Sequence, residues 1–194
     1  MRKIILGLSV LAVMVFTSGC ATMHMGWTAV TQQHKLDDGA MKAYDDMFTK
    51  VAKYGDPARA MMKEYKVAED VSGDDVKESI TALAEEYNMR LTGYVKMFTK
   101  KDAKPNEVKE ARIYSLCSLY IAKVFLNHSR YFGGFMPCRV MYIQYGNGDA
   151  YLITMDLTLA IHGGYPLPPK MAKLAAKVKT AMEDIPARAA KGDF

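Results

Sequence analysis

The amino-acid sequence predicts one α+β domain, in which an antiparallel sheet packs against helices. Several short segments alternate apolar and polar residues, which is the period of a half-buried strand. An Asn-Gly turn joins two of these segments, as in a β-hairpin. Amphipathic helical segments come before, between and after the strands, and a chain of 194 residues has room for a single core of this kind.

The start of the chain has the pattern of a secretory signal. A basic beginning precedes an apolar run over residues 4–16, which is too short to span a membrane as a mature helix. Residues 17–20 read Thr-Ser-Gly-Cys and resemble a bacterial lipoprotein processing site, with Thr in place of the usual Leu. We expect removal of residues 1–19 and lipidation of Cys20, which would hold the protein at a membrane. An ordinary secretory signal is the alternative.

The compartment and the charge follow from this leader. A lipidated protein would face the periplasm, and Ala21 after the Cys implies the outer membrane by analogy with other Gram-negative lipoproteins. Loss of Arg2 and Lys3 with the leader lowers the net charge from +5 to +3, which is too little to argue for a nucleic-acid partner. The composition, half apolar and about a quarter charged, excludes a largely disordered or multi-span membrane protein.

Two segments separate the leader from the domain. Residues 20–35 are polar and mixed without a sustained period, so we expect a lipid-anchored linker there. Residues 36–57 predict a helix, because apolar side chains recur every three or four residues until Gly55-Asp56-Pro57. This helix either packs on the domain or acts as a spacer. Residues 58–194 form the predicted α+β domain.

The first half of the domain predicts two strands around a helix. Residues 61–69 alternate as an edge strand does. Ser72 stands at an N-cap position, and Asp74 and Asp75 in the following turn favour a helix that continues to Tyr87. Residues 90–98 predict the next strand, and residues 100–106 predict a charged turn.

The second half predicts three strands and two helices. A short strand is expected at residues 111–116 and a short, largely buried helix at residues 118–127. Residues 138–145 and 150–155 form the hairpin. A loop over residues 161–167 leads to Pro168-Pro169, which starts a last helix that continues to Ile185. The resulting order is β-α-β4-α with a helical insertion.

Several of these residues resemble the domain of unknown function 302 family. The resemblance covers residues 67–187 and is carried by the Ser-capped helix at 71–75, by Cys117 at a strand end, and by Phe-Met-Pro-Cys-Arg-Val at 135–140. It implies a compact β-α-β4-α domain, often a homodimer, with no established reaction. The helix at residues 36–57 has no counterpart in that family.

Cys117 closes one predicted strand and Cys138 opens the next, so both thiols would lie at one end of the sheet if these strands are antiparallel neighbours. Three alternatives follow. In an oxidising periplasm the pair would form a disulfide that contributes on the order of 3 kcal/mol. A reversible redox pair is the second, although the two-residue spacing that lowers a thiol pKa is absent.

The third alternative is a copper or haem-iron site. Thiolate, thioether and imidazole ligands suit these metals, and the sequence offers Cys117, His128, Met136 and Cys138 if the fold brings them together. A second candidate is Met23-His24-Met25, which resembles a weak copper-capture sequence on a flexible tether; a solvated linker is the alternative. His162 lies in a Gly-Gly loop and is a candidate ligand-binding residue or an exposed turn residue.

Three functional hypotheses remain, and the first is favoured. Zinc-type spacing, a phosphate-binding Gly-Lys loop, a Ser elbow and a covalent haem motif are all absent from the sequence, which favours a non-catalytic protein. The first hypothesis is a periplasmic lipoprotein that binds a small ligand, a soft metal or a partner protein near Cys117 and Cys138. The second is a thiol redox or electron-transfer accessory protein. The third is an envelope assembly factor that docks a partner on the helix over residues 36–53.

Overall fold

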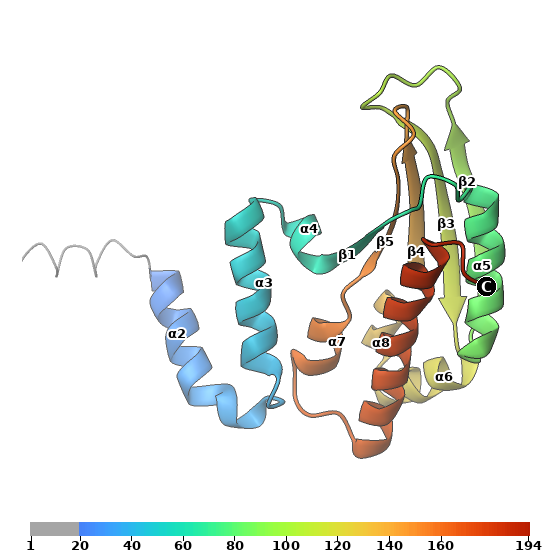
Figure 1. Ribbon diagram of the computed structural model, residues 1–194. Coiled ribbons are helices and arrows are strands. Elements are labelled where there is room, and N and C mark those ends of the chain that lie inside the picture. The colour runs from blue at the N-terminus through green and yellow to red at the C-terminus, as the bar shows by residue number, and fades with distance from the viewer. Residues whose placement is uncertain (1–19) are drawn as a thin grey trace, which may run out of the picture.

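The computed structural model describes residues 20–194, so the predicted signal peptide at residues 1–19 lies outside the described residues. Its centre is a five-stranded antiparallel sheet with the order β1-β5-β4-β3-β2. The predicted α+β class and the β-α-β4-α order are confirmed (Figure 1). The strands are β1 (Met62–Lys66), β2 (Arg90–Thr99), β3 (Val108–Cys117), β4 (Cys138–Tyr145) and β5 (Ala150–Met155).

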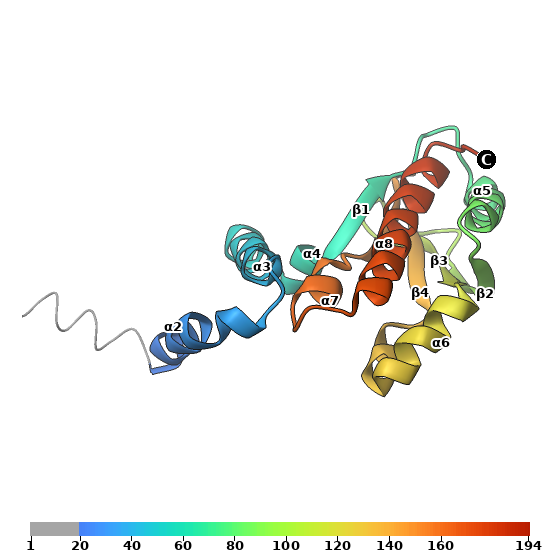
Figure 2. The same cartoon turned by 90° about the horizontal axis from the view of Figure 1, so that it is seen from below.

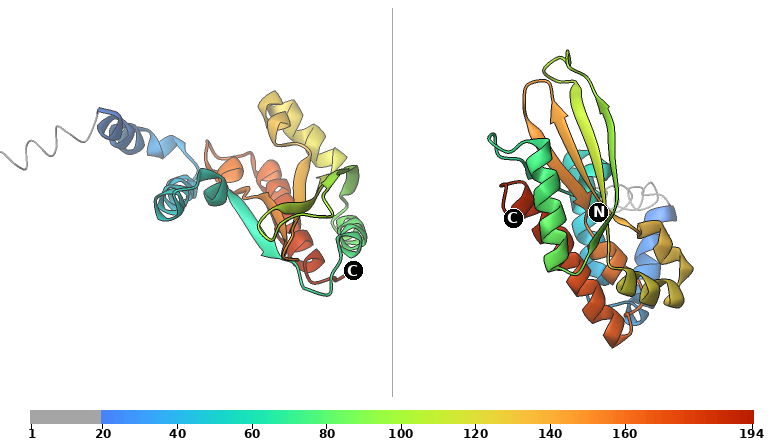
Figure 3. Two further views of the ribbon diagram at one scale, coloured as in Figure 1. Left: turned by 90° about the horizontal axis from the view of Figure 1, so that it is seen from above. Right: turned by 90° about the vertical axis from the view of Figure 1, so that its right-hand side faces the viewer.

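Two helices, α5 (Gly73–Glu86) and α8 (Pro169–Ala189), pack side by side on one face of the sheet (Figures 1 and 3). The predicted N-cap of α5 is confirmed as a capping box. The Ser72 hydroxyl accepts a hydrogen bond from the Asp75 N–H, and the Asp75 carboxylate accepts one from the Ser72 N–H. The largest fully buried core side chains come from both layers: Tyr114, Tyr142, Ile80, Leu83, Leu116, Leu152, Met182 and Ile185.

One charged side chain is buried between α5 and the sheet. Arg112 on β3 is 4% exposed and forms ion pairs with Glu110 and with Asp74, the latter at 2.6 Å. The Arg112 guanidinium also donates to the carbonyl of Gly73, at the first turn of α5. A buried charge is tolerated only when it is paired and hydrogen-bonded, and this network meets both conditions.

The predicted N-terminal helix is confirmed as α3 (Ala40–Tyr54), which ends at Gly55 in the left-handed conformation. It contacts the short helices α4 (Pro57–Met61) and α7 (Thr158–His162), so it packs on the domain instead of acting as a spacer. The Lys50 ammonium lies 3.7 Å from the Asp156 carboxylate just before α7, and this ion pair adds to the contact. Helix α3 therefore packs against the domain, although it lies outside the sheet.

Residues 20–35, which we expected to be a lipid-anchored linker, are helical. Helix α2 (Cys20–Gln32) and the 3-10 helix η1 (Gln33–Lys35) occupy this segment, and α2 stands away from the sheet (Figures 1 and 2). The segment contains no Pro and a single Gly, and its Ala, Met and Gln residues favour a helix. The helix propensity of these residues therefore decides the structure of residues 20–35, although the segment has no apolar period. Within residues 20–194, every helix is too short or too polar to cross a membrane.

Three further expectations need correction. Strand β3 starts at Val108 and is longer than predicted. Helix α6 (Leu119–His128) is mostly exposed and not buried, because it lies at the end of the sheet and buries only Phe125. A 3-10 helix η2 (Arg130–Phe135) and helix α7 were not predicted. Both of these elements border the candidate site.

Candidate functional site

Cys117 and Cys138 lie at one end of the sheet, as predicted, because β3 and β4 are antiparallel neighbours. The register pairs Cys138 with Leu116, whose side chain is buried against the helices. Successive side chains of a strand point to opposite faces, so Cys117 points away from the face that holds Cys138. Both cysteines are free thiols, and the predicted disulfide is absent from the described residues.

The surroundings of the two thiols disfavour redox chemistry. Burial raises the pKa of the Cys138 thiol to about 11, and the nearby Cys117 adds to this shift. Burial also raises the pKa of Cys117. The thiolate is the reactive form of cysteine and the form that binds metals, and a raised pKa keeps both groups protonated at neutral pH. Burial thus acts against the lowered thiol pKa that is typical of a redox pair.

The predicted metal set comes together only in part. Met136 and Cys138 line one cavity, whereas Cys117 points to the opposite face of the sheet. His128 is exposed at the end of α6, where its ring lies 6.3 Å from the ring of Phe132. Across residues 20–194, no group of three or more His, Cys, Asp and Glu side chains is placed to hold a metal ion.

The second metal candidate, Met23-His24-Met25, lies on α2 and not on a flexible tether. Side chains that follow each other on a helix point about 100° apart, so these three residues do not converge on one ion. The side chains of Met23 and Met25 are mostly exposed, as is Trp27 on the same helix. The helix thus presents apolar groups to its surroundings instead of a ligand set.

His162, for which the sequence left open a ligand-binding role or an exposed turn, makes a structural contact. It ends α7, and its Nδ1 lies 2.8 Å from the carboxylate of Asp37. The Gly39 N–H and then His162 lower the pKa of Asp37 through hydrogen bonds to its carboxylate. The Tyr44 hydroxyl donates to the carbonyl of Gly163 at 2.7 Å. His162 therefore helps to hold the start of α3 against α7.

One binding feature at the Cys138 end is an apolar cavity of about 70 Å³, which we call the Phe125 pocket. Phe125 on α6 packs edge to face on Phe132 of η2, with ring centroids 5.0 Å apart. Met171 and Ala175 of α8 pack against the same cluster. The lining is apolar throughout: Ile121, Phe125, Phe132, Phe135, Met136, Cys138, Leu157, Ala160, Ile161, Ala175 and Val178.

Sequence reasoning placed Met136 and Cys138 at a site but missed the aromatic part of it. The missed side chains are Phe125, Phe132 and Phe135, which come from α6 and η2. Their spacing of seven and three residues is compatible with one helix, but a Gly-Gly step follows Phe132 and η2 is a separate element. The dense run of aromatic residues between two strands was the available signal.

The comparison with family models decides the family. Residues 63–185 match the family described as Domain of unknown function DUF302, which is more than half of the chain. The chain belongs to the DUF302 family. The resemblance seen in the sequence is thereby confirmed for the domain, and the match says nothing of a lipid anchor.

A solved DUF302 structure agrees with the fold. It is the crystal structure of an uncharacterized conserved DUF302 protein from Bacillus stearothermophilus, with a TM-score of 0.51 and 13% sequence identity. The match covers 66% of this chain and 98% of that protein. No curated protein matches the chain.

The boundaries of the DUF302 domain separate the Phe125 pocket from the N-terminal helices. Every residue that lines the Phe125 pocket lies within the domain. Helices α2, α3 and α4 precede it and are additions of this chain to the matched DUF302 region. A function of the Phe125 pocket belongs to the domain, whereas a function that needs α3 belongs to the added segment.

Proposed function

We propose that this protein is a non-catalytic binding module of the bacterial envelope, held by lipid at Cys20 and facing the periplasm from the outer membrane. The domain binds an apolar group, such as the end of an acyl chain, in the Phe125 pocket. The observation that carries the proposal is the lining of that pocket, which contains neither a charged side chain nor an amide. Such a site selects its ligand by burial of apolar surface, at roughly 25 cal/mol per Å².

The size of the pocket limits the ligand. An engineered apolar cavity of roughly 150 Å³ accepts benzene, and the Phe125 pocket is about half as large. A single hydrocarbon chain is narrower than an aromatic ring and therefore suits the pocket better. Phe135 is 43% exposed at the edge of the pocket, so its ring is accessible to the part of a ligand that remains outside.

Helix α2 supports the membrane part of the proposal. It includes Cys20, and Trp27 and Val30 are about 70% exposed on it. Trp side chains are enriched where a membrane meets water. An exposed apolar helix next to an acylated residue is suited to lie against the membrane surface. The predicted homodimer and the predicted envelope partner stay predictions.

The ligand proposal is tested with 1-octanol as a single-chain probe and two neighbouring variants of α8. Ala175 is 3% exposed and lines the Phe125 pocket, whereas Ala176 is exposed. Ala175→Leu is expected to weaken 1-octanol binding about tenfold, because the larger side chain occupies the cavity. Ala176→Leu makes the same chemical change outside the pocket and should leave binding unchanged. Calorimetric titration of the full chain measures both.

Two outcomes of that titration would contradict the proposal. Equal binding by wild type and Ala175→Leu would mean that octanol does not use the Phe125 pocket. Loss of binding in Ala176→Leu alone would place the ligand in the groove between α6 and α8, which Ala176 lines. Circular dichroism of both variants separates a filled pocket from a damaged fold.

A further inference from the structure

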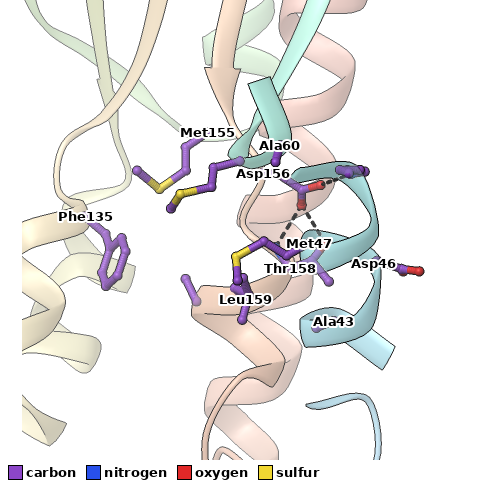
Figure 4. A pocket seen from close by; sticks show the side chains of 12 residues that line it. Ala43, Asp46, Met47, Ala60, Phe135, Met155, Asp156, Thr158 and Leu159 are labelled. Carbon is purple, nitrogen blue, oxygen red and sulfur yellow. Dashed lines mark hydrogen bonds and ion pairs between the residues drawn. The ribbon is translucent and has the colours of Figure 1, made fainter. Parts of the chain in front are cut away.

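A second cavity lies between the added helices and the DUF302 domain. It has a volume of about 220 Å³ and is bordered by α3, α4, the end of β5 and α7 (Figure 4). Three of its lining side chains are methionines: Met47 from α3, Met61 from α4 and Met155 from β5. We call this space the Met47 cavity.

The backbone around these methionines is fixed by regular hydrogen bonds. The carbonyl of Met61 accepts a bond from the Asp156 N–H at 2.9 Å, and Met62 pairs with Met155 in the β1–β5 ladder. Figure 4 shows the side chains of Met47 and Met155 directed into the same space, with the ring of Phe135 at its border. Three thioethers from separate elements thus reach one cavity.

Ordinary core filling does not account for this arrangement. Methionine is a common gap-filler in buried cores, but Met61 is 42% exposed and Met47 and Met155 are only partly buried. A space remains between these side chains where packing would normally remove it. The thioethers are therefore accessible to a small solute from solvent.

The charged side chains that line the cavity are paired. Lys42 lies 2.6 Å from the Asp46 carboxylate and Lys50 lies 3.7 Å from the Asp156 carboxylate, so the charges around the cavity balance. The Asp156 carboxylate also accepts hydrogen bonds from the Thr158 hydroxyl and N–H.

We propose that Met47, Met61 and Met155 form a three-thioether binding site for a soft monovalent metal ion, Cu(I). Uncharged sulfur ligands select Cu(I) over zinc, magnesium and calcium, which prefer nitrogen, oxygen or thiolate ligands. The ring of Phe135 borders the site.

The proposed site combines residues of the added helices α3 and α4 with a residue of the DUF302 domain. Met47 and Met61 precede the DUF302 match, and Met155 lies within it. The ion pair of Lys50 with Asp156 and the contact of Asp37 with His162 hold α3 at this place. The added helix therefore supplies a ligand that the matched region of the family does not contain. The proposal needs neither cysteine. The two cavities share Phe135 and Ala160, but none of the three methionines lines the Phe125 pocket.

The test follows the methionine methyl groups directly. The full chain is labelled with ¹³C at the methionine methyls and titrated with Cu(I) in acetonitrile without oxygen. The resonances of Met47, Met61 and Met155 are expected to shift together and to saturate at about one equivalent, while Met97 on β2 does not respond. A parallel titration with Zn²⁺ should leave all of these methyls unmoved. Shifts confined to Met23, Met25 or Met136 would overturn the proposal.

A triple variant supplies the matching affinity measurement. Met→Leu exchange conserves volume and apolar character, so Met47→Leu, Met61→Leu and Met155→Leu together should preserve the fold. Competition with bicinchoninate is expected to show about tenfold or more loss of Cu(I) affinity relative to wild type. Met97→Leu is the matched control and should bind as wild type does. Undiminished affinity in the folded triple variant would refute the site, and its unchanged binding of 1-octanol would show that the Phe125 pocket is separate.

Discussion

Replacement of Arg112 by methionine is expected to lower the free energy of unfolding by about 3–5 kcal/mol. The Arg112 side chain is 5% exposed and neutralises Glu110, whose side chain is 12% exposed. Without Arg112, Glu110 keeps only the Lys96 ammonium at 3.1 Å, and the carbonyl of Gly73 loses its strongest donor. Asp74 is mostly exposed and is hydrated instead. Urea unfolding followed by circular dichroism measures the loss.

Lys109 provides the matched control for this change. It precedes Glu110 on β3 and makes no ion pair in the described part of the chain, so Lys109→Met should alter stability by only about 0.5 kcal/mol. A loss below about 1 kcal/mol in Arg112→Met would contradict the view that Arg112 compensates a buried carboxylate.

The same network predicts a pH dependence. Burial alone would raise the pKa of Glu110, but hydrogen bonds from Arg112 and Lys96 lower it below its usual value of 4.5. A lowered pKa in the folded state gives stability that is present above the pKa of the unfolded chain. This stability is lost as the pH falls through the folded pKa. Wild type should therefore lose stability below about pH 4, and Arg112→Met should lose less over the same range.

Replacement of Cys20 by alanine is expected to move the protein from the membrane fraction to the soluble fraction of its native host. Stable anchoring needs more than one acyl chain, each contributing about 0.8 kcal/mol per buried methylene, and a chain without Cys20 carries none. Fractionation followed by immunoblotting measures the change. Mass spectrometry of the wild type should find a cleaved chain that starts at an acylated Cys20.

Cys138→Ala is the control for this experiment, since that thiol is partly buried in the domain and is not expected to carry lipid. It should stay with the membrane as wild type does. An intact leader, or a Cys20→Ala protein that remains fully in the membrane fraction, would contradict the lipid anchor and the compartment.

The elements predicted best from the sequence are those whose local signals agree. The hairpin strands at residues 138–145 and 150–155 have the predicted bounds, because alternation and the Asn-Gly turn coincide there. Ser72 and Asp75 identified the start of α5 for the same reason. Helix α2 was missed because it has helix-forming residues without an apolar period. An apolar period in the sequence shows which face of a helix is buried. It gives little information about a helix on which nothing packs.

The candidate sites were harder to predict than the fold. The shared sheet end of Cys117 and Cys138 follows from strand order, but their opposite faces depend on a register in which Leu116 and not Cys117 pairs with Cys138. A shift of one residue in the β3–β4 register would have placed both thiols on the same face of the sheet. The Met47 cavity unites side chains more than one hundred residues apart in sequence, so local spacing carries no sign of it.

The most direct test of the proposed function is whether an apolar chain enters the Phe125 pocket. ¹³C-methyl spectra of the full chain during titration with 1-octanol report this, since Met136 lines the pocket and Met97 is exposed on β2. We predict a saturable shift of the Met136 methyl with no shift of the Met97 methyl. A Met136 resonance that stays in place while octanol binds elsewhere would contradict the proposal.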